Sequence, residues 1–193
     1  MIPWIRKPAV SFSGKEWYTI KKSKSAGGLA AMTLPKRKPI RLPTYDYSAP
    51  GAYFVTICTA DRRCILSDIT VGAAISRPQE VSLTGYGEIV DKAIRDIPSV
   101  YPMLSVEKYV IMPNHVHALL RIHADESGRL IAAPTISRVV GQMKRRASSE
   151  AGVPLWQKSY HEHVIRSERD YREIWEYIDE NPAKWAQDRY YTP

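Results

Sequence analysis

The chain has 193 residues with 44% hydrophobic and 25% charged side chains, a composition typical of globular proteins that argues against a disordered or fibrous chain. The sequence has no apolar run of about eighteen residues and no signal-peptide pattern, so we expect a cytoplasmic protein without a membrane span. Its two cysteines, Cys58 and Cys64, are too few for a disulfide framework or for a zinc site built from cysteine pairs.

The net charge of +8 is concentrated near the N-terminus. The first 50 residues hold ten Lys and Arg side chains against Glu16 and Asp46, and the rest of the chain has as many acidic as basic side chains. Residues 1–45 are also rich in Lys, Ser, Gly and Pro, which predicts a basic arm, extended or partly disordered, ahead of a domain over residues 46–193. Such an arm can contact nucleic-acid phosphates, or it can be an ordinary solvated tail, and Met32 offers an alternative start.

Hydrophobic periodicity predicts alternating strands and helices after this arm. The strands are expected at Ala52–Thr59, Leu104–Met112, His115–Ile122 and Trp156–Arg166. The helices are expected at Gly87–Ile97, Ile136–Ala147 and Glu168–Glu180. Residues 64–84 suit a hairpin or an irregular excursion. Without the last helix, the order β-α-β-β-α-β predicts an α+β fold, a ferredoxin-like antiparallel sheet sandwich.

Local signals set the bounds of these elements. Thr84 is placed to cap the first helix, Pro113–Asn114 suits a tight turn between two strands, and Pro182 stops the last helix. The helix that begins at Ile136 has a cationic end made of Lys144, Arg145 and Arg146.

The strand at His115–Ile122 carries the clearest chemical signal. Because strand side chains alternate between two faces, the even-numbered residues form an apolar face typical of a core. The odd-numbered residues place His115, His117 and Arg121 on the other face. Two imidazoles two residues apart can bind one divalent metal, although surface or hydrogen-bonded histidines show the same spacing.

The last helix offers a third ligand for such a metal. Tyr177 and Asn181 are four residues apart and therefore share a face, and Asn181 at the helix end can present an amide oxygen. Tyr177 would then lie near the metal. In the alternative interpretation, Tyr177 packs in the core with its helical neighbours and Asn181 is only a C-cap.

Four strings of residues, spread over about residues 41–188, resemble the REP-associated tyrosine transposases, a branch of the single-tyrosine His-hydrophobic-His (HUH) transposases. In chain order they are Arg41-Leu-Pro-x-Tyr-Asp-Tyr-Ser with Tyr53-Phe-Val-Thr-Ile-Cys-Thr, then Tyr109-Val-Ile-Met-Pro-Asn-His-Val-His-Ala-Leu-Leu, then Trp156-Gln-Lys-Ser-Tyr-His-Glu-His-Val-Ile-Arg, and finally Tyr177-Ile-Asp-Glu-Asn-Pro-Ala-Lys-Trp. Residues 1–40 match no motif of the family.

The resemblance implies roles for individual residues. His115, His117 and Asn181 would hold a divalent metal, Mg²⁺ or Mn²⁺, and Tyr177 would be the nucleophile. His163 matches a position typical of the branch and would support the structure or contact DNA. Tyr171 is the rival nucleophile; it lies about 240° around the helix from Tyr177 at roughly 100° per residue, so both cannot face the metal. The Asn181 spacing favours Tyr177.

The resemblance also implies the reaction. The protein would be an enzyme, a DNA transposase that cuts and rejoins single-stranded DNA through a 5′-phosphotyrosine intermediate at palindromic REP hairpins. The covalent bond conserves the phosphodiester energy, and the sequence accordingly has no phosphate-binding loop for ATP. We expect a hairpin or single-stranded DNA partner and no membrane, and both a monomer and a homodimer remain open.

Basic side chains in the N-terminal arm, in the strand at His115–Ile122 and in the helix at Ile136–Ala147 are the expected DNA contacts. They are Lys36, Arg37, Lys38, Arg41, Arg121, Lys144, Arg145 and Arg146. In the alternative interpretation, these side chains are a solvated tail and an ordinary helix end.

Two other functions remain open from the sequence. A domesticated relative could hold palindromic hairpins without cutting them, which the basic arm suits equally well. A weaker alternative takes His115, His117, His161 and His163 as a structural metal site.

Overall fold

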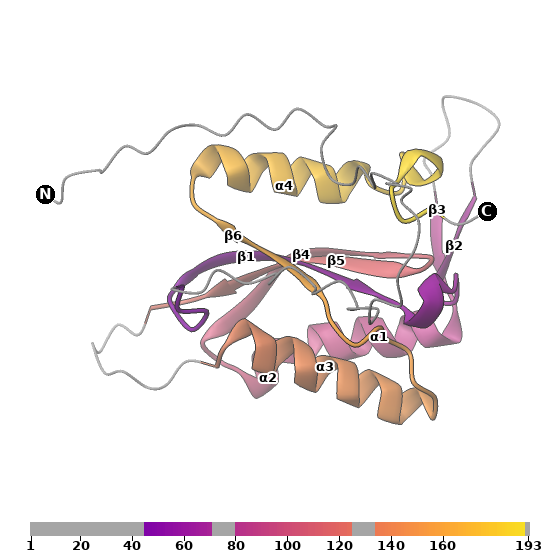
Figure 1. Ribbon diagram of the computed structural model, residues 1–193, viewed down its shortest axis with the longest axis horizontal. Helices are drawn as coiled ribbons and strands as arrows, with labels where there is room; N and C mark the ends of the chain where they lie inside the picture. Colours follow the sequence, from indigo (N-terminus) through magenta and orange to yellow (C-terminus); the bar gives the residue numbers. More distant parts are fainter. Residues whose placement is uncertain (1–44, 71–79, 125–133, 192–193) are drawn as a thin grey trace, which may run out of the picture. The chain divides into compact units, whose positions relative to one another are not determined.

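The structure is a computed structural model that describes residues 45–70, 80–124 and 134–191 (Figure 1). These residues all belong to one compact unit, Lys38–Pro193. The predicted basic arm, except for Tyr45, lies outside the described residues, and so do Lys36, Arg37, Lys38 and Arg41. The arm therefore stays a prediction. No helix of the described part is long and apolar enough to cross a membrane.

A four-stranded antiparallel sheet forms the centre of this unit. Its strands are β1 (Gly51–Cys58), β4 (Leu104–Met112), β5 (His115–Ile122) and β6 (His161–Ile165). The spatial order β4-β5-β1-β6 puts the histidine-bearing strand β5 beside β1. In this register Cys58 lies opposite His115, and Thr56 lies opposite His117.

Helices cover both faces of this sheet (Figure 1). Helices α1 (Gly85–Arg95), α2 (Ile97–Val100) and α3 (Ile136–Ala151) lie on one face, and α4 (Glu168–Glu180) lies on the other. A hairpin of β2 (Ser67–Thr70) and β3 (Glu80–Leu83) is inserted before α1. The order β1-α1-β4-β5-α3-β6 confirms the predicted ferredoxin-like fold, and the hairpin agrees with the predicted excursion.

The two faces of β5 have separate hydrophobic partners because strand side chains alternate. The even-numbered residues Val116–Ile122 belong to the main core shared with α1 and α3. On the opposite face, Leu119 and Ala52 pack against Ile178 of α4 in a smaller cluster. Burial of this second face holds α4 against the strand that carries the histidines.

Capping residues explain where α1 and α3 begin. The Thr84 hydroxyl accepts a hydrogen bond from the Gly87 amide at 3.1 Å, as predicted, although α1 begins and ends two residues earlier than expected. Thr135 caps α3 in the same way.

The predicted ranges of α3 and of the last strand also differ from the structure. Helix α3 continues four residues past Ala147 to Ala151, and Gly152, with a left-handed φ of 69°, ends it. Lys144, Arg145 and Arg146 are therefore not in the last turn, and the predicted cationic helix end is corrected. Strand β6 is also shorter than expected, because Trp156 makes only an isolated bridge with Thr59.

Candidate active site

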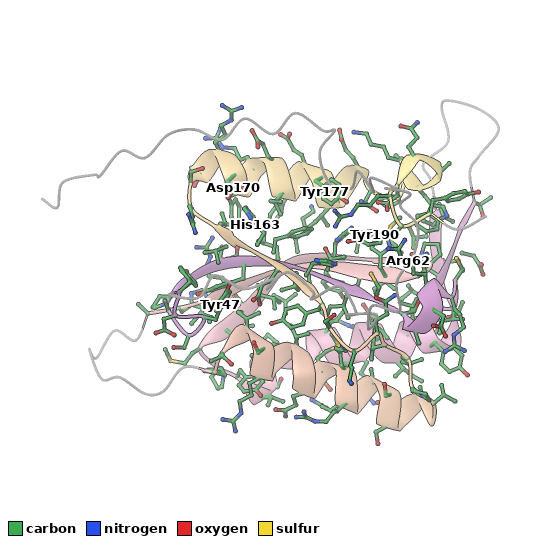
Figure 2. All side chains as sticks on the ribbon, viewed as in Figure 1. Tyr47, Arg62, His163, Asp170, Tyr177 and Tyr190 are labelled. Carbon is green, nitrogen blue, oxygen red and sulfur yellow. The ribbon has the colours of Figure 1, made fainter. Side chains whose placement is uncertain are left out.

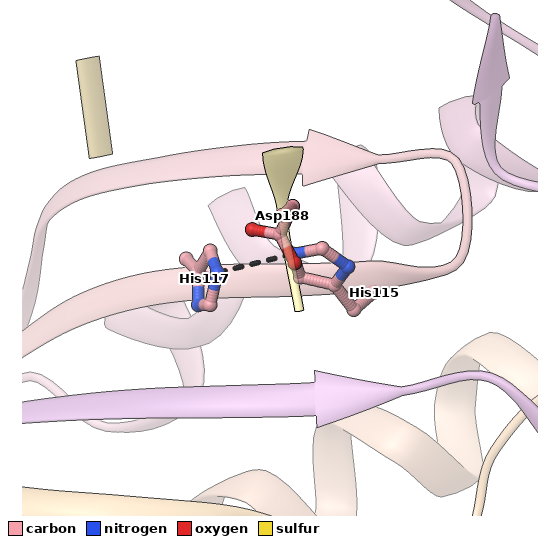
Figure 3. Close-up of side chains that lie close together, drawn as sticks. All are labelled: His115, His117 and Asp188. Atoms are coloured by element: carbon pink, nitrogen blue, oxygen red, sulfur yellow. Dashed lines mark hydrogen bonds between the residues drawn. The ribbon is translucent and has the colours of Figure 1, made fainter. Parts of the chain in front are cut away.

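His115 and His117 form a buried pair on the α4 face of β5. Their Nε2 atoms lie 3.0 Å apart, and their rings meet edge to face (Figure 3). Two nitrogens bound at neighbouring positions of an octahedral ion, about 2.1 Å from it, are about 3.0 Å apart. The pair therefore has the spacing of two ligands to one metal ion.

Neighbouring side chains orient both imidazoles. The Asn114 Oδ1 lies 2.8 Å from His115 Nδ1, and the Asn114 Nδ2 donates to the Tyr190 carbonyl at 2.7 Å. This second bond fixes the amide orientation, so Nδ1 of His115 carries the proton and its Nε2 lone pair faces His117. The Thr56 hydroxyl lies 2.9 Å from His117 Nδ1 and can donate or accept a hydrogen bond. It therefore permits the same tautomer in His117, with the proton on Nδ1 and the lone pair on Nε2. Partners of this kind orient metal-binding histidines.

Asp188 completes a cluster of three potential ligands with the two histidines (Figure 3). One ligand atom from each residue lies within 4.8 Å of the others. Asn181, predicted as the third ligand, is also buried, and its Nδ2 donates to Asp188 Oδ2 at 3.3 Å. Its Oδ1 is buried without a hydrogen-bond partner among the described residues. A buried orphan oxygen beside this cluster suits a metal ligand.

Tyr177 of α4, labelled in Figure 2, contacts His117 of the pair. Its hydroxyl lies 3.3 Å from His117 Nε2, and its ring meets those of His117 and Phe54 edge to face. Tyr177 is 39% exposed, whereas both imidazoles of the pair are buried. The structure thus brings Tyr177 together with the four potential ligands.

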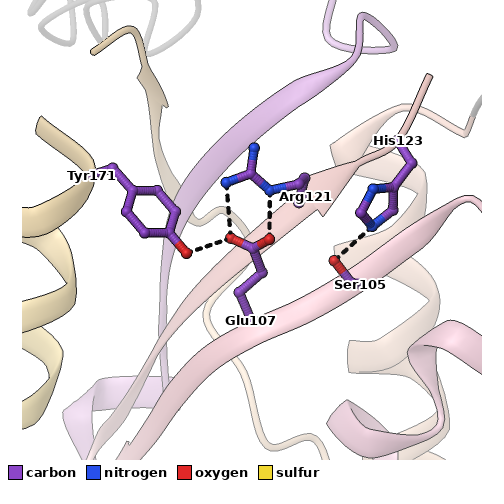
Figure 4. A network of polar contacts seen from close by, with 5 residues as sticks. All are labelled: Ser105, Glu107, Arg121, His123 and Tyr171. Atoms are coloured by element: carbon purple, nitrogen blue, oxygen red, sulfur yellow. Dashed lines mark hydrogen bonds and ion pairs between the residues drawn. The ribbon is translucent and has the colours of Figure 1, made fainter. Parts of the chain in front are cut away.

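Tyr171, the rival nucleophile, belongs to a different polar network (Figure 4). Its hydroxyl donates to Glu107 Oε2 at 2.7 Å, and the same carboxylate is paired with Arg121. Tyr171 therefore ties α4 to β4, and its hydroxyl does not face the histidines.

Burial dominates the protonation of the pair. It lowers the pKa of His115 to about 3, with smaller contributions from the positive charges of Arg189 and Arg62. Burial also lowers the pKa of His117 well below its usual range, helped by His115 and Arg189. Both rings are thus neutral near pH 7, which is the form that binds metal ions. Burial raises the pKa of Tyr177, and so does the Asp188 carboxylate.

The sequence is similar to two proteins of Haemophilus influenzae. No family model matches the chain. An uncharacterised protein of Haemophilus influenzae is 32% identical over 177 residues, covering 81% of this chain and 93% of that protein. A second Haemophilus influenzae protein, named "Putative REP-associated tyrosine transposase", is 25% identical over 149 residues, covering 72% of this chain and 74% of that protein.

The solved structure of a REP-associated tyrosine transposase bound to a REP hairpin shares the fold. It has a TM-score of 0.54 and 23% identity, covering 75% of this chain and 74% of that one. The chain is a relative of the REP-associated tyrosine transposases.

Several other predicted residues lie apart from the histidine pair of this transposase relative. His163 Nε2 lies 2.9 Å from Asp170 Oδ2, which ties β6 to the first turn of α4 (Figure 2). His161 and His163 do not join the cluster of potential ligands, so the four-histidine alternative loses its support. Arg121 is paired with Glu107.

The cations of α3 lie on the helix that covers the opposite face of the sheet (Figure 1). Lys144 Nζ donates to the Gln157 carbonyl at 2.6 Å, and Arg146 pairs with Asp96 at 2.8 Å. Arg145 has an exposed side chain. The structure does not bring these three residues together with the site.

Sequence reasoning missed several residues of the site, namely Thr56, Arg62, Asn114, Asp188, Arg189 and Tyr190. Asn114 directly precedes His115, and that adjacency was the one available signal. Asp188 follows Pro182 and the 3₁₀ turn Trp185–Gln187, which interrupt the helical period. No spacing rule could therefore connect Asp188 to Asn181.

Proposed function

We propose that this protein cuts and rejoins single-stranded DNA, with Tyr177 as the nucleophile. The observation that carries the proposal is the Tyr177 hydroxyl 3.3 Å from His117 Nε2, beside a second imidazole, a carboxylate and an unpartnered amide oxygen. A nucleophile next to a potential metal site is the arrangement that metal-assisted phosphoryl transfer requires.

The reaction follows from the chemistry of a phenol and a phosphodiester. The Tyr177 oxygen forms a bond to phosphorus, the phenol proton leaves to solvent, and the bond from phosphorus to the 3′ oxygen breaks. The products are a 5′-phosphotyrosine and a free 3′-hydroxyl, which takes up a proton. Attack by a 3′-hydroxyl on the phosphotyrosine reverses these steps and joins the strand without ATP.

His115, His117 and Asn181 would hold a divalent metal, Mg²⁺ or Mn²⁺, with Asp188 as an additional ligand. When bound, the ion would withdraw electron density from the phosphate and oppose the raised pKa of the Tyr177 phenol. Asn114 and Thr56 keep the two imidazoles aimed at one point.

We further propose a DNA hairpin as the partner, as in the related transposase that was solved with a REP hairpin. The basic arm around Lys36, Arg37, Lys38 and Arg41 and the exposed Arg145 are the proposed phosphate contacts, and Arg121, Lys144 and Arg146 complete the set. Phosphate contacts position a folded hairpin, and unpaired flanking bases supply specificity.

A denaturing gel tests the proposal through the covalent adduct. The protein is incubated with a labelled palindromic hairpin that has single-stranded extensions, in Mg²⁺ or in Mn²⁺. We expect an adduct that EDTA and Tyr177→Phe each abolish. Tyr171→Phe is the matched control, because it removes a hydroxyl from the same helix that bonds Glu107, and it should keep the adduct.

A different outcome would favour the non-cleaving alternative. Tight hairpin binding without an adduct in either metal, together with unchanged affinity in His117→Ala, would indicate a hairpin-binding protein derived from a transposase. An adduct of full yield in Tyr177→Phe would show that the assigned nucleophile is wrong.

A further inference from the structure

Two arginines, Arg62 and Arg189, lie over the ring of Tyr190, which contacts His115; Figure 2 shows Arg62 and Tyr190. The Cζ of Arg62 lies 5.3 Å and that of Arg189 lies 4.5 Å from the centroid of this ring. The buried Tyr190 ring itself lies 4.7 Å from that of His115. Arg62 comes from the turn after β1 and Arg189 from the C-terminal segment, so the fold brings them together from distant parts of the chain.

Asn114 connects both arginine-bearing segments to the site. Its Nδ2 donates to the Tyr190 carbonyl at 2.7 Å and lies 3.4 Å from the Arg62 carbonyl. Its Oδ1 orients His115 at the same time. Asn114 thus holds the backbone next to each guanidinium and also orients His115, a potential metal ligand.

Neither guanidinium has a carboxylate partner within 4.0 Å in the described part of the chain. Five other arginines in that part, among them Arg95 and Arg146, do form such ion pairs. The side chains of Arg62 and Arg189 are exposed.

The backbone at Arg62 is strained. Asp61 and Arg62 both have a φ of 55°, in the left-handed region that residues other than glycine rarely adopt. Such strain persists where surrounding contacts impose it, and it is concentrated at functional sites. Glycine would relieve the strain at position 62, yet an arginine is present there.

We propose that Arg62 and Arg189 form a clamp that binds the nonbridging oxygens of the phosphodiester attacked by Tyr177. This inference rests on the proposed function. A guanidinium offers several donors in one plane, which suits two oxygens of one phosphate, and stacking on an aromatic ring limits its motion. The clamp assigns Tyr190 as a positioning residue, because its ring supports both guanidiniums.

A binding experiment without metal or cleavage tests the clamp. Tyr177→Phe protein in EDTA is titrated with the labelled hairpin, and binding is followed by fluorescence anisotropy. Each linkage of the single-stranded extensions is replaced in turn by a methylphosphonate, which removes the charge of one phosphate. Arg62→Gln and Arg189→Gln are compared with Arg95→Gln, an exposed arginine of α1 paired with Asp91.

We expect one or two adjacent linkages at which the neutral substitution weakens binding by about ten-fold or more. Each clamp variant should bind unmodified DNA about ten-fold more weakly and be insensitive to substitution at that linkage. Its plot of log affinity against log salt should also lose about 0.7 in slope, the value for one phosphate of a single strand. Arg189→Lys should recover only part of the loss, and Arg95→Gln should behave as the parent.

The outcomes separate the clamp from the proposed function. Equal sensitivity of parent and clamp variants at every linkage would overturn the clamp. The cleavage position is mapped separately with Tyr177 intact. Cleavage at a linkage whose methylphosphonate is tolerated would refute the clamp and leave the function standing. A sensitive linkage in a hairpin that is never cut would confirm phosphate binding and overturn the proposed function.

Discussion

Replacing Asn114 by alanine removes the side chain that orients His115. In the structure Asn114 is fully buried and bonds His115 Nδ1 at 2.8 Å and the Tyr190 carbonyl at 2.7 Å. A buried group left without a partner costs about 1–3 kcal/mol, so the loss of both bonds should lower the free energy of unfolding by about 2–6 kcal/mol. Loss of the partner of a metal-binding histidine should also weaken divalent affinity by about 10–100-fold.

Asn114→Asp separates these two effects. The carboxylate keeps an acceptor for His115 Nδ1 but replaces the donor to the Tyr190 carbonyl by a second acceptor. We therefore expect a similar loss of stability with divalent affinity within about ten-fold of the parent. Urea unfolding measures the stability, and calorimetric titration with Mn²⁺ measures the affinity. If Asn114→Ala bound Mn²⁺ as tightly as the parent protein, the proposed orientation of His115 by Asn114 would be refuted.

Three further substitutions have expected outcomes. Asp188→Asn removes the one carboxylate of the cluster, so it should weaken Mn²⁺ binding by about ten-fold or more in the same titration. Unchanged affinity would exclude Asp188 as a ligand. Gly87→Ala should lower the free energy of unfolding in urea by about 1–3 kcal/mol, because the added Cβ would lie 2.0 Å from the Leu66 carbonyl oxygen. An unchanged midpoint of urea unfolding would contradict this close approach of Gly87 to Leu66. Lys144→Met should lower the free energy of unfolding by about 1–3 kcal/mol, because its amine donates to the Gln157 carbonyl, and should also weaken hairpin binding, because Lys144 is a proposed phosphate contact; an unchanged affinity would exclude a DNA contact by Lys144.

Elements governed by local signals could be predicted closely from the sequence. The bounds of β4, β5 and α4 match the expected ranges, because period-two alternation, the Pro113–Asn114 turn and Pro182 are all local. Helix α3 was predicted too short because its exposed last turn has little periodicity, and Gly152 rather than the cations ends it. Trp156 is of a residue type that is common in strands, but it forms only an isolated bridge with Thr59.

The candidate site was predictable where its residues share one element. The spacing of His115 and His117 on β5 indicated a pair, and the spacing of Tyr177 and Asn181 on α4 indicated a shared face. Asp188 enters the cluster only through the tertiary course of the C-terminal segment, which no periodicity describes.

The central claim is that Tyr177 forms a covalent bond to DNA. The measurement that tests it most directly is mass spectrometry of the proteolysed adduct, which identifies the tyrosine that carries the nucleotide among the 12 in the chain. We predict a single modified peptide with the nucleotide on Tyr177. A nucleotide on Tyr171, Tyr190 or any other tyrosine would contradict the account.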